Sequence, residues 1–460
     1  MDAIREAFQY RSRFEGSTMV FKIDFPVTEA PGFPYLMKDL ALLSKVGFRI
    51  AIVPGTREAI DSALKRHEIA YGYGAASESG EPARITAERA MPFVEMAAFG
   101  AATRFMTCLS ASRVDAVIGN FVRARGLGVV GGVDMERSGA VDKIYDKSIS
   151  RMLDLGAIPI LPCIGWSPTG KPYNVPSDEI ALAASSALGA AKLFIVSAWS
   201  GIRRGRFALP ESVETREDGS IVRLTPQEAE ALIASLCAER AGGSERIGGE
   251  AQSGEARLDE AALALRELRL ALRASRAGVE RAHIIDGREE GAVLQELFSN
   301  LGAGTMVYAD EFESIRPLRS RDVADALRLM EPFMRAGTLI RRSAEQIQER
   351  KGDYAALELD GSIRACGALR DWGEGQGEIA AVASDPRYSG MNLGRRIVGY
   401  LIDKARRQNM RRVFALTTCT QDWFESLGFG EIPLDSLPAP KLLGYDKGRG
   451  SKAFALEITA

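Results

Sequence analysis

The sequence contains only two histidines, His67 and His283, and five widely spaced cysteines. With two histidines, a His-based triad or a multi-histidine zinc site is hard to build, and no cysteine pair has the CxxC spacing typical of a metal or redox centre. An odd number of scattered cysteines is typical of a reducing compartment. We therefore expect no metal site and a cytoplasmic protein.

The sequence also lacks an excess of charge and a long apolar run. Its 59 basic and 61 acidic residues give a formal net charge of -2, which offers no electrostatic basis for binding nucleic acid or an anionic membrane. No apolar segment reaches the roughly 20 residues that span a bilayer. The charged N-terminal segment has no apolar signal core. We expect neither a nucleic-acid partner nor a membrane partner.

The 460 residues are too many for one ordinary domain, and the first half alternates short apolar strands with helices. Strands are predicted at 19–23, 48–53, 116–118, 158–161, 193–196 and 282–285, with helices such as 34–45 and 178–188 between them. This alternation predicts an α/β fold with a doubly wound, mainly parallel sheet. The Gly-, Ser- and Glu-rich segment 240–256 is interpreted as a flexible insertion.

The pattern changes near residues 308–317, which we interpret as a linker between domains 1–307 and 318–460. The second half predicts strands at 315–318, 354–359, 363–369, 378–384 and 413–417, and helices at 322–336, 393–408 and 421–427. Asp360-Gly361 between two β-runs is a strong hairpin signal. This order predicts a smaller, mixed α/β domain.

One segment of the second half, residues 377–405, combines a strand, a loop of small residues and a helix. A glycine-containing loop that enters a helix presents free backbone N–H groups to an anion such as a pyrophosphate. With WFESLGF at 423–429, this segment resembles the GNAT acetyltransferase family, which implies an acetyl-CoA site. Ser389 and Asn392 depart from the family's Arg/Gln-x-x-Gly-x-Gly/Ala loop. The resemblance implies acetyl-CoA contacts from Val382, Ala383, Ser389, Gly390, Met391, Asn392, Leu393, Gly394 and Arg395.

Direct acetyl transfer needs an amine that has lost a proton, so a general base is useful. Glu378, on the strand beside the coenzyme, is the candidate base, acting through a water; the alternative is a solvated carboxylate at a strand start. The tyrosine of many GNAT enzymes is replaced here by Trp423-Phe424. Thr420 aligns with a serine of the N-acetylglutamate synthase branch and is the candidate contact for the thiolate or the tetrahedral intermediate. Its alternative role is a helix N-cap.

Two arginine-containing segments, 339–343 and 445–452, resemble the same branch. Guanidinium groups bind carboxylates in bidentate fashion, so arginines suit a substrate with two carboxylates. The resemblance implies that Arg342 (or Arg341), Arg449 and Ser451 hold L-glutamate. For a single arginine, the alternative is ordinary surface charge.

The first domain resembles the amino-acid kinase family, and specifically N-acetylglutamate kinase. The similarity lies at Lys22 and at residues 53–57, 84–86, 119–121 and 174–178. A kinase carries a Gly-Gly pair after the first strand, where phosphate approaches the backbone. This chain has Asp24-Phe25-Pro26, which repels and obstructs phosphate. We expect no kinase activity, although Asp178 remains and a ligand can still bind.

Residues 283–288, 294–299 and 302–305 resemble the signature of arginine-inhibited members. The resemblance implies an L-arginine site with Tyr10, His283, Glu296 and Gly302, in which Glu296 accepts the guanidinium. It also implies a homo-oligomer, a hexamer in such relatives. The alternative for His283 is an ordinary strand residue with a satisfied ring.

The paired domains together resemble N-acetylglutamate synthases over nearly the whole chain except 240–256. This implies acetyl transfer from acetyl-CoA to the α-amino group of L-glutamate, giving N-acetyl-L-glutamate and CoA. It is the first step of arginine biosynthesis, with feedback regulation by L-arginine. Three alternatives stay open: an N-acetylglutamate kinase with an accessory acetyltransferase domain, a non-catalytic arginine-binding regulator, and a GNAT enzyme for another amine.

Overall fold

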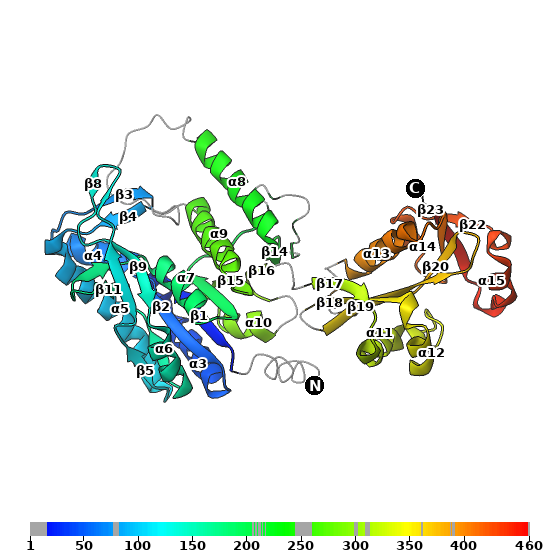
Figure 1. The fold of residues 1–460 in the computed structure, drawn as a ribbon, viewed down its shortest axis with the longest axis horizontal. Coiled ribbons are helices and arrows are strands. Elements are labelled where there is room, and N and C mark those ends of the chain that lie inside the picture. The colour runs from blue at the N-terminus through cyan, green and yellow to red at the C-terminus, as the bar shows by residue number, and fades with distance from the viewer. Residues whose placement is uncertain are drawn as a thin grey trace. The chain divides into compact units, whose positions relative to one another are not determined.

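The protein divides into two compact units, Met1–Ala309 and Asp310–Ala460, in a computed structural model (Figure 1). The structure describes residues 16–76, 82–204, 207, 209, 213, 215–216, 218–243, 260–298, 302–308, 313–359, 362–386, 388 and 392–458. Within these ranges, no helix combines the length and apolar character needed to cross a membrane.

The first unit is built on an eight-stranded sheet with the order β14-β16-β15-β13-β1-β2-β10-β5. Its strands are β1 (Thr18–Ile23), β2 (Arg49–Pro54), β5 (Ala116–Ile118), β10 (Ile158–Ile160), β13 (Lys192–Ser197), β14 (Arg223–Leu224), β15 (Arg281–Asp286) and β16 (Thr305–Tyr308). Neighbouring strands are parallel except β15 and β16. Helices cover both faces, which explains why β1 and β13 are buried along their whole length.

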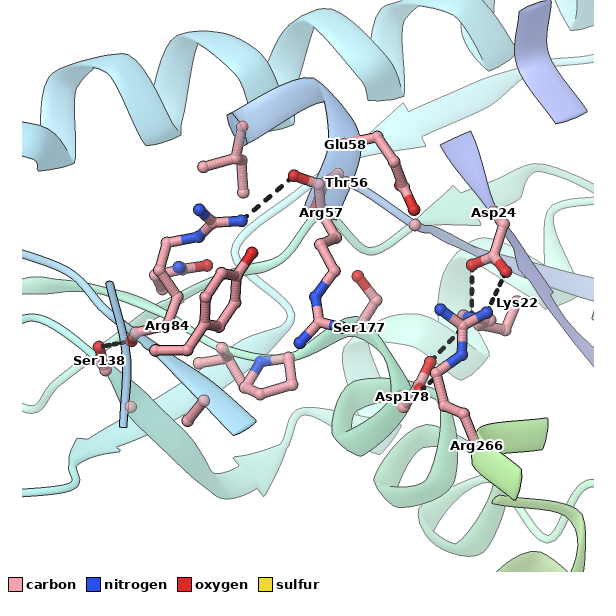
Figure 2. Close-up of a pocket in the computed structure, with 18 of the residues that line it drawn as sticks. Lys22, Asp24, Thr56, Arg57, Glu58, Arg84, Ser138, Ser177, Asp178 and Arg266 are labelled. Carbon is pink, nitrogen blue, oxygen red and sulfur yellow. Dashed lines mark hydrogen bonds and ion pairs between the residues drawn. The ribbon is translucent and has the colours of Figure 1, made fainter. Parts of the chain in front are cut away.

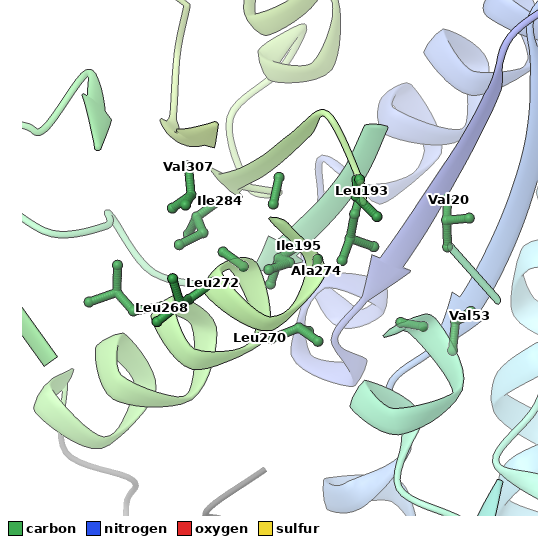
Figure 3. Packing of buried hydrophobic residues seen from close by; sticks show 14 of the residues in the cluster. Val20, Val53, Leu193, Ile195, Leu268, Leu270, Leu272, Ala274, Ile284 and Val307 are labelled. Carbon is green, nitrogen blue, oxygen red and sulfur yellow. The ribbon is translucent and has the colours of Figure 1, made fainter. Parts of the chain in front are cut away.

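Alternation along β1 decides which side chains meet which helices. Met19, Phe21 and Ile23 pack toward α3 (Phe33–Lys45), α5 (Met91–Ala111) and α10 (Ala292–Phe298). Val20 packs on the opposite face with α7 (Ser177–Ala187) and α9 (Glu260–Arg276), where strand and helix side chains interlock (Figure 3). Because side chains alternate along a strand, Lys22 shares the face of Val20 and lies beneath α7 and α9.

Further elements complete the first unit, and several of them border the carboxyl ends of β1 and β2. They are α2 (Phe25–Glu29), α4 (Arg57–Arg66), α6 (Asp146–Asp154), α8 (Pro226–Gly243), the hairpins β3 (Gly72–Ala76) with β4 (Pro82–Ile85) and β7 (Val129–Val130) with β8 (Val133–Asp134), and a four-stranded sheet of β12 (Pro172–Asn174), β11 (Ile164–Trp166), β6 (Val122–Gly126) and β9 (Gly139–Ile144). Ligands of open α/β sheets bind at such an edge.

The second unit has a seven-stranded sheet with the order β17-β18-β19-β20-β21-β23-β22. Its strands are β17 (Glu313–Pro317), β18 (Tyr354–Leu359), β19 (Ser362–Asp371), β20 (Gln376–Ser384), β21 (Arg412–Thr417), β22 (Gly430–Ile432) and β23 (Lys452–Glu457). The helix α13 (Leu393–Arg407) packs on one face, and α11 (Val323–Arg335) and α12 (Ala344–Glu349) pack on the other. Two short helices follow β21 and β22, namely α14 (Gln421–Glu425) and α15 (Ala439–Leu443).

The two central strands of this sheet, β20 and β21, separate along their length. They are the one parallel pair and are in register only at Gln376–Glu378 and Arg412–Phe414. Beyond Glu378, β20 carries a bulge against β19, and Ala381 there has a φ of 55°, in the left-handed region. A bulge bends its strand and increases its twist. The sheet therefore opens at its centre, directly after Glu378.

These observations confirm the predicted parallel sheet followed by a smaller mixed domain. The expected linker at 308–317 was drawn too long, because Tyr308 belongs to β16 and residues 313–317 form β17 of the second sheet. The strands β22 and β23 and the helices α12 and α15 were missed. Most of the expected insertion 240–256, and the turn residues Asp360 and Gly361, lie outside the described residues.

Candidate active site

Glu378 lies where β20 and β21 separate, and its carboxylate is almost fully buried, with 6% of the residue exposed. The Lys441 ammonium of α15 lies 2.5 Å from its Oε1, and the Trp372 indole N–H donates to its Oε2 over 2.9 Å. The alternative prediction, a solvated carboxylate at the start of a strand, is therefore wrong for Glu378. Glu378 is a positioned carboxylate at the closed end of the opening.

Thr420 lies on the other side of the opening, after β21. It precedes α14, yet its side chain makes no capping bond. Its hydroxyl lies 2.7 Å from that of Thr417, whose oxygen also accepts the backbone N–H groups of Cys419 and Thr420. Because Thr417 already accepts twice, its own O–H can donate to Thr420. That arrangement leaves the Thr420 proton available to a further acceptor.

The residues expected at acetyl-CoA follow β20. Val382 and Ala383 lie on β20 beyond its pairing with β21. Asn392, with a φ of 48°, leads into α13, where Leu393 is buried and Arg395 donates to the Ser426 carbonyl. A Cβ on Gly394 would lie 3.2 Å from the Trp423 ring, so glycine allows α13 and α14 to approach closely. Ser389, Gly390 and Met391 lie outside the described residues.

This helix start fits a phosphate group. The first turn of a helix has free N–H groups and the positive end of the helix dipole. Because α13 follows β20, and α14 follows β21, their contact at Gly394 places that turn at the open end of the gap.

The segments expected to hold the substrate meet on the opposite side of the sheet from α13. The Arg449 guanidinium donates to the carbonyls of Gly337 and Thr338, just before the segment that carries Arg341 and Arg342. Arg341 is exposed, whereas Arg342 is half-buried and donates to the Ile340 carbonyl. Ser451 is buried beside the end of β21, because its neighbour Lys452 pairs with Thr417.

The first unit has a separate pocket at the carboxyl ends of β1 and β2, bordered by Lys22, Asp24, Arg57, Arg84, Ser177, Asp178 and Arg266, among others (Figure 2). Lys22 is ion-paired with Asp24 at 2.5 Å and with Asp178 at 2.8 Å. Arg266 of α9 pairs with the second oxygen of Asp24. The carboxylate of Asp24 is thus held between two buried cations.

These charges compensate one another. Burial opposes the charge of Asp178, but Lys22 and Arg266 outweigh it and lower the pKa of Asp178 to about 2. Burial likewise opposes the charge of Lys22, yet Asp178 and Asp24 raise its pKa. A phosphate arriving here would meet the Asp24 carboxylate where the kinase pattern has glycine. The expectation of an inactive kinase site thus has a geometric basis.

A third cluster lies on the α10 side of the first sheet. The rings of Phe21, Phe194 and His283 stack across β1, β13 and β15, with centroid separations of 4.5 and 4.7 Å. His283 Nδ1 lies 2.6 Å from Glu296 Oε1, while Glu296 Oε2 accepts the N–H groups of Ala303 and Gly304.

Gly302 completes this cluster, because its φ is 63° and a Cβ there would overlap Glu296 Oε2. The structure therefore brings His283, Glu296 and Gly302 together. Tyr10 lies outside the described residues.

Comparison with known proteins links the two units. The amino acid kinase family matches residues 26–210, and the GNAT acetyltransferase family matches residues 323–429. The amino-acid acetyltransferase of Neisseria meningitidis serogroup B is 33% identical over 458 residues, covering 97% of this chain and 95% of the relative. That of Aeromonas salmonicida is 32% identical over 467 residues, covering 99% and 98%. The chain belongs to the amino-acid acetyltransferase family.

Solved structures agree with this assignment. A crystal structure of N-acetylglutamate synthase from Neisseria gonorrhoeae, complexed with coenzyme A and L-arginine, has a TM-score of 0.81 at 29% identity and covers 100% of this chain and 99% of that one. The same synthase complexed with coenzyme A and N-acetyl-glutamate has a TM-score of 0.58 at 29% identity, with the same coverage. This amino-acid acetyltransferase therefore shares its fold over its full length with that synthase.

Sequence reasoning missed three residues beside Glu378 in the candidate site: Arg370, Trp372 and Lys441. Lys441 reaches Glu378 across 63 positions of sequence, so no local pattern indicates it. The aromatic Trp372, just after a predicted strand, was the available signal; Arg370 lies opposite Glu378 only through the register of β19 and β20. Among the described residues of the acetyltransferase, no group of histidine, cysteine and carboxylate side chains can hold a metal ion.

The His283 cluster predicts a pH effect on stability. Burial and the neighbouring Lys192 lower the pKa of His283 to about 4. Burial opposes the charge of Glu296, but its bonds to His283 and to the backbone lower its pKa to about 2. Between pH 7.5 and 5.0 the unfolded chain binds a proton at His283 that the folded chain does not. Acidification therefore removes about 2 kcal/mol of stability at this residue.

Burial raises the pKa of Glu267 to about 7, so acidification increases the stability contributed by this residue. The contribution of His283 is therefore isolated by comparing the wild type with His283→Gln. The stability advantage of the wild type over this variant is expected to shrink by about 2 kcal/mol from pH 7.5 to 5.0. Hydrogen exchange of the β13 and β15 amides measures this difference in stability at each pH. An advantage that stays constant with pH would contradict the buried, neutral His283.

Proposed function

We propose that this enzyme transfers the acetyl group of acetyl-CoA to the α-amino group of L-glutamate. The observation that carries the proposal is the buried carboxylate of Glu378 at the point where β20 and β21 separate. The opening beyond it, with the start of α13 at its far end, suits a long donor with a phosphate-bearing end. The Neisseria gonorrhoeae synthase, solved in complexes with coenzyme A and with N-acetyl-glutamate, supports the same donor and acceptor.

In this mechanism Glu378 accepts the proton that the amine loses as it attacks the thioester carbonyl, directly or through a water. Lys441 and Trp372 hold the carboxylate in place through both of its oxygens. Thr420, with its proton available, donates to the departing thiolate of CoA. The bond that forms is the amide, and the bond that breaks is the thioester.

The acceptor side is rich in cations, which favours a dicarboxylate. Arg342 and Arg449 come from two segments that meet at the end of α11, and Lys441 lies beside Glu378. An arginine binds a carboxylate through two parallel N–H groups. This composition favours L-glutamate over a polyamine or a protein lysine, whose positive charge these groups would repel.

The first unit would bind L-arginine as a regulator, at the cluster of His283, Glu296 and Gly302. Glu296 is ionised and buried, which suits a guanidinium partner. The relative complexed with L-arginine supports this role. In this proposal the reaction opens arginine biosynthesis, L-arginine acts as its feedback effector, and the chain works as a homo-oligomer in the cytoplasm.

The test follows CoA release from acetyl-CoA with L-glutamate, L-aspartate or L-glutamine, each with and without L-arginine. Glutamate-dependent release that L-arginine changes would support the whole proposal. Release that L-arginine leaves unchanged, with no arginine binding by calorimetry, would remove the regulatory part. Arginine binding without any turnover of glutamate would favour a non-catalytic regulator instead.

A further inference from the structure

Arg370 differs from the other arginines of its sheet. Arg316 of β17 pairs with Asp322 and Glu358, and Arg364 of β19 pairs with Asp385. Arg370 is half-buried near the end of β19, yet no described carboxylate or carbonyl accepts a hydrogen bond from it. Its guanidinium lies over the Trp372 ring, 3.9 Å from the centroid. A half-buried guanidinium with its donors unused is suited to a ligand from outside the chain.

The position of Arg370 relative to the candidate base is fixed by the sheet. Arg370 and Glu378 are directly opposite each other on the antiparallel strands β19 and β20. Directly opposite residues project from the same face, with Cβ atoms about 5 Å apart. Both oxygens of Glu378 are already held, by Lys441 and Trp372, so Arg370 does not serve to neutralise it.

The surroundings favour an anion next to Arg370. Burial and the nearby Arg350 lower the pKa of Arg370, and together with Arg342 they outweigh the opposite effect of the Glu378 and Asp353 carboxylates. The stack on Trp372 holds the planar guanidinium in one orientation, which reduces the entropy lost when it binds a carboxylate.

We propose that Arg370 binds the α-carboxylate of the acceptor amino acid, a proposal that rests on the proposed function. The reacting amine must lie near Glu378, and the α-carboxylate is attached to the same carbon as that amine. Lys441 is already paired with Glu378, so the neighbouring cation left to meet the α-carboxylate is Arg370, directly opposite Glu378 on β19. Arg342 and Arg449, around the end of α11, remain for the side-chain carboxylate.

The experiment compares L-glutamate with its two monoamides, L-isoglutamine, which lacks the α-carboxylate charge, and L-glutamine, which lacks the side-chain charge. In Arg370→Gln, the KM for L-glutamate is expected to rise roughly 10- to 150-fold. The preference for L-glutamate over L-isoglutamine should fall by a similar factor. The preference over L-glutamine and the KM for acetyl-CoA should stay as in the wild type. The KM of Arg370→Lys for L-glutamate should lie between those of the wild type and Arg370→Gln, because lysine keeps the charge but loses the bidentate geometry.

The matched control is Arg335→Gln, because Arg335 is an exposed arginine whose one carboxylate partner among the described residues is Glu331 of α11. This variant should behave like the wild type. An Arg370→Gln enzyme that loses kcat, while both preferences stay unchanged, would show that Arg370 only supports Trp372. If the wild type acetylates L-glutamate and Arg370→Gln has the same KM for L-glutamate, this proposal is overturned and the proposed function is not. A wild type that does not acetylate L-glutamate would overturn the proposed function and this proposal with it.

Discussion

Replacing Glu378 with glutamine is expected to lower kcat for glutamate acetylation roughly 10²- to 10⁴-fold, the usual contribution of a general base. Glutamine keeps the size of the side chain and can still accept from the Trp372 indole. It cannot take a proton from the attacking amine. The KM for acetyl-CoA should change little, because the proposed donor site lies beyond Glu378. Stopped-flow or steady-state CoA release measures the effect.

The loss of a buried partner for Lys441 complicates this variant, so two controls accompany it. Glu331→Gln removes an exposed carboxylate of α11, paired with Arg335, and should leave the rate unchanged. The double variant Glu378→Gln with Lys441→Met removes the unpaired cation. It should recover thermal stability without recovering the rate. A single variant with near wild-type kcat would exclude Glu378 as the base.

Replacing Asp24 with alanine is expected to destabilise the first unit by about 3–5 kcal/mol, the usual cost of removing one partner from a buried ion pair. Asp24 lies between Lys22 and Arg266, and all three side chains are at most 10% exposed. Without it, two buried cations share Asp178. Urea unfolding followed by hydrogen exchange in β1 and β13 measures the change.

The control for Asp24 is Asp142→Ala, which removes a half-exposed partner of Arg123 and should cost about 0–1 kcal/mol. Equal stability of the two variants would mean that the Asp24 network contributes little. Asp24→Gly would restore the glycine of the kinase pattern. It should share the instability and still hydrolyse no ATP, because the surrounding pocket is organised around the carboxylate.

The element order of both units was predictable, because buried parallel strands such as β1 and β13 are nearly continuous apolar runs, while amphipathic helices such as α13 alternate on a longer period. The error at 308–317 has a physical cause. A strand was predicted at 315–318, but β17 begins two residues earlier, with the polar Glu313 and Ser314, which do not differ from the residues of a loop. β22 has only three residues and no alternation to detect.

The residues of the candidate site were predictable where each lies in sequence next to a recognisable strand or loop. Glu378 comes before the predicted coenzyme loop, and Thr420 comes just after β21, so their order along the sequence reflects their place in the sheet. Lys441 and Arg370 were not predictable in this way. Their roles depend on a contact across 63 positions and on the register of two strands, which only the folded structure defines.

The separation of β20 and β21 has a consequence for how the enzyme binds an extended molecule. Past Glu378, each strand turns an edge toward the gap, and the two edges do not pair with each other. Such an edge offers main-chain donors and acceptors to any extended chain that carries amides. The pantetheine arm of acetyl-CoA contains two amides, so it can join the sheet as a short additional strand. These edges face each other inside the domain, where another protein chain cannot reach them to aggregate. The donor substrate would thus become part of the secondary structure during each turnover.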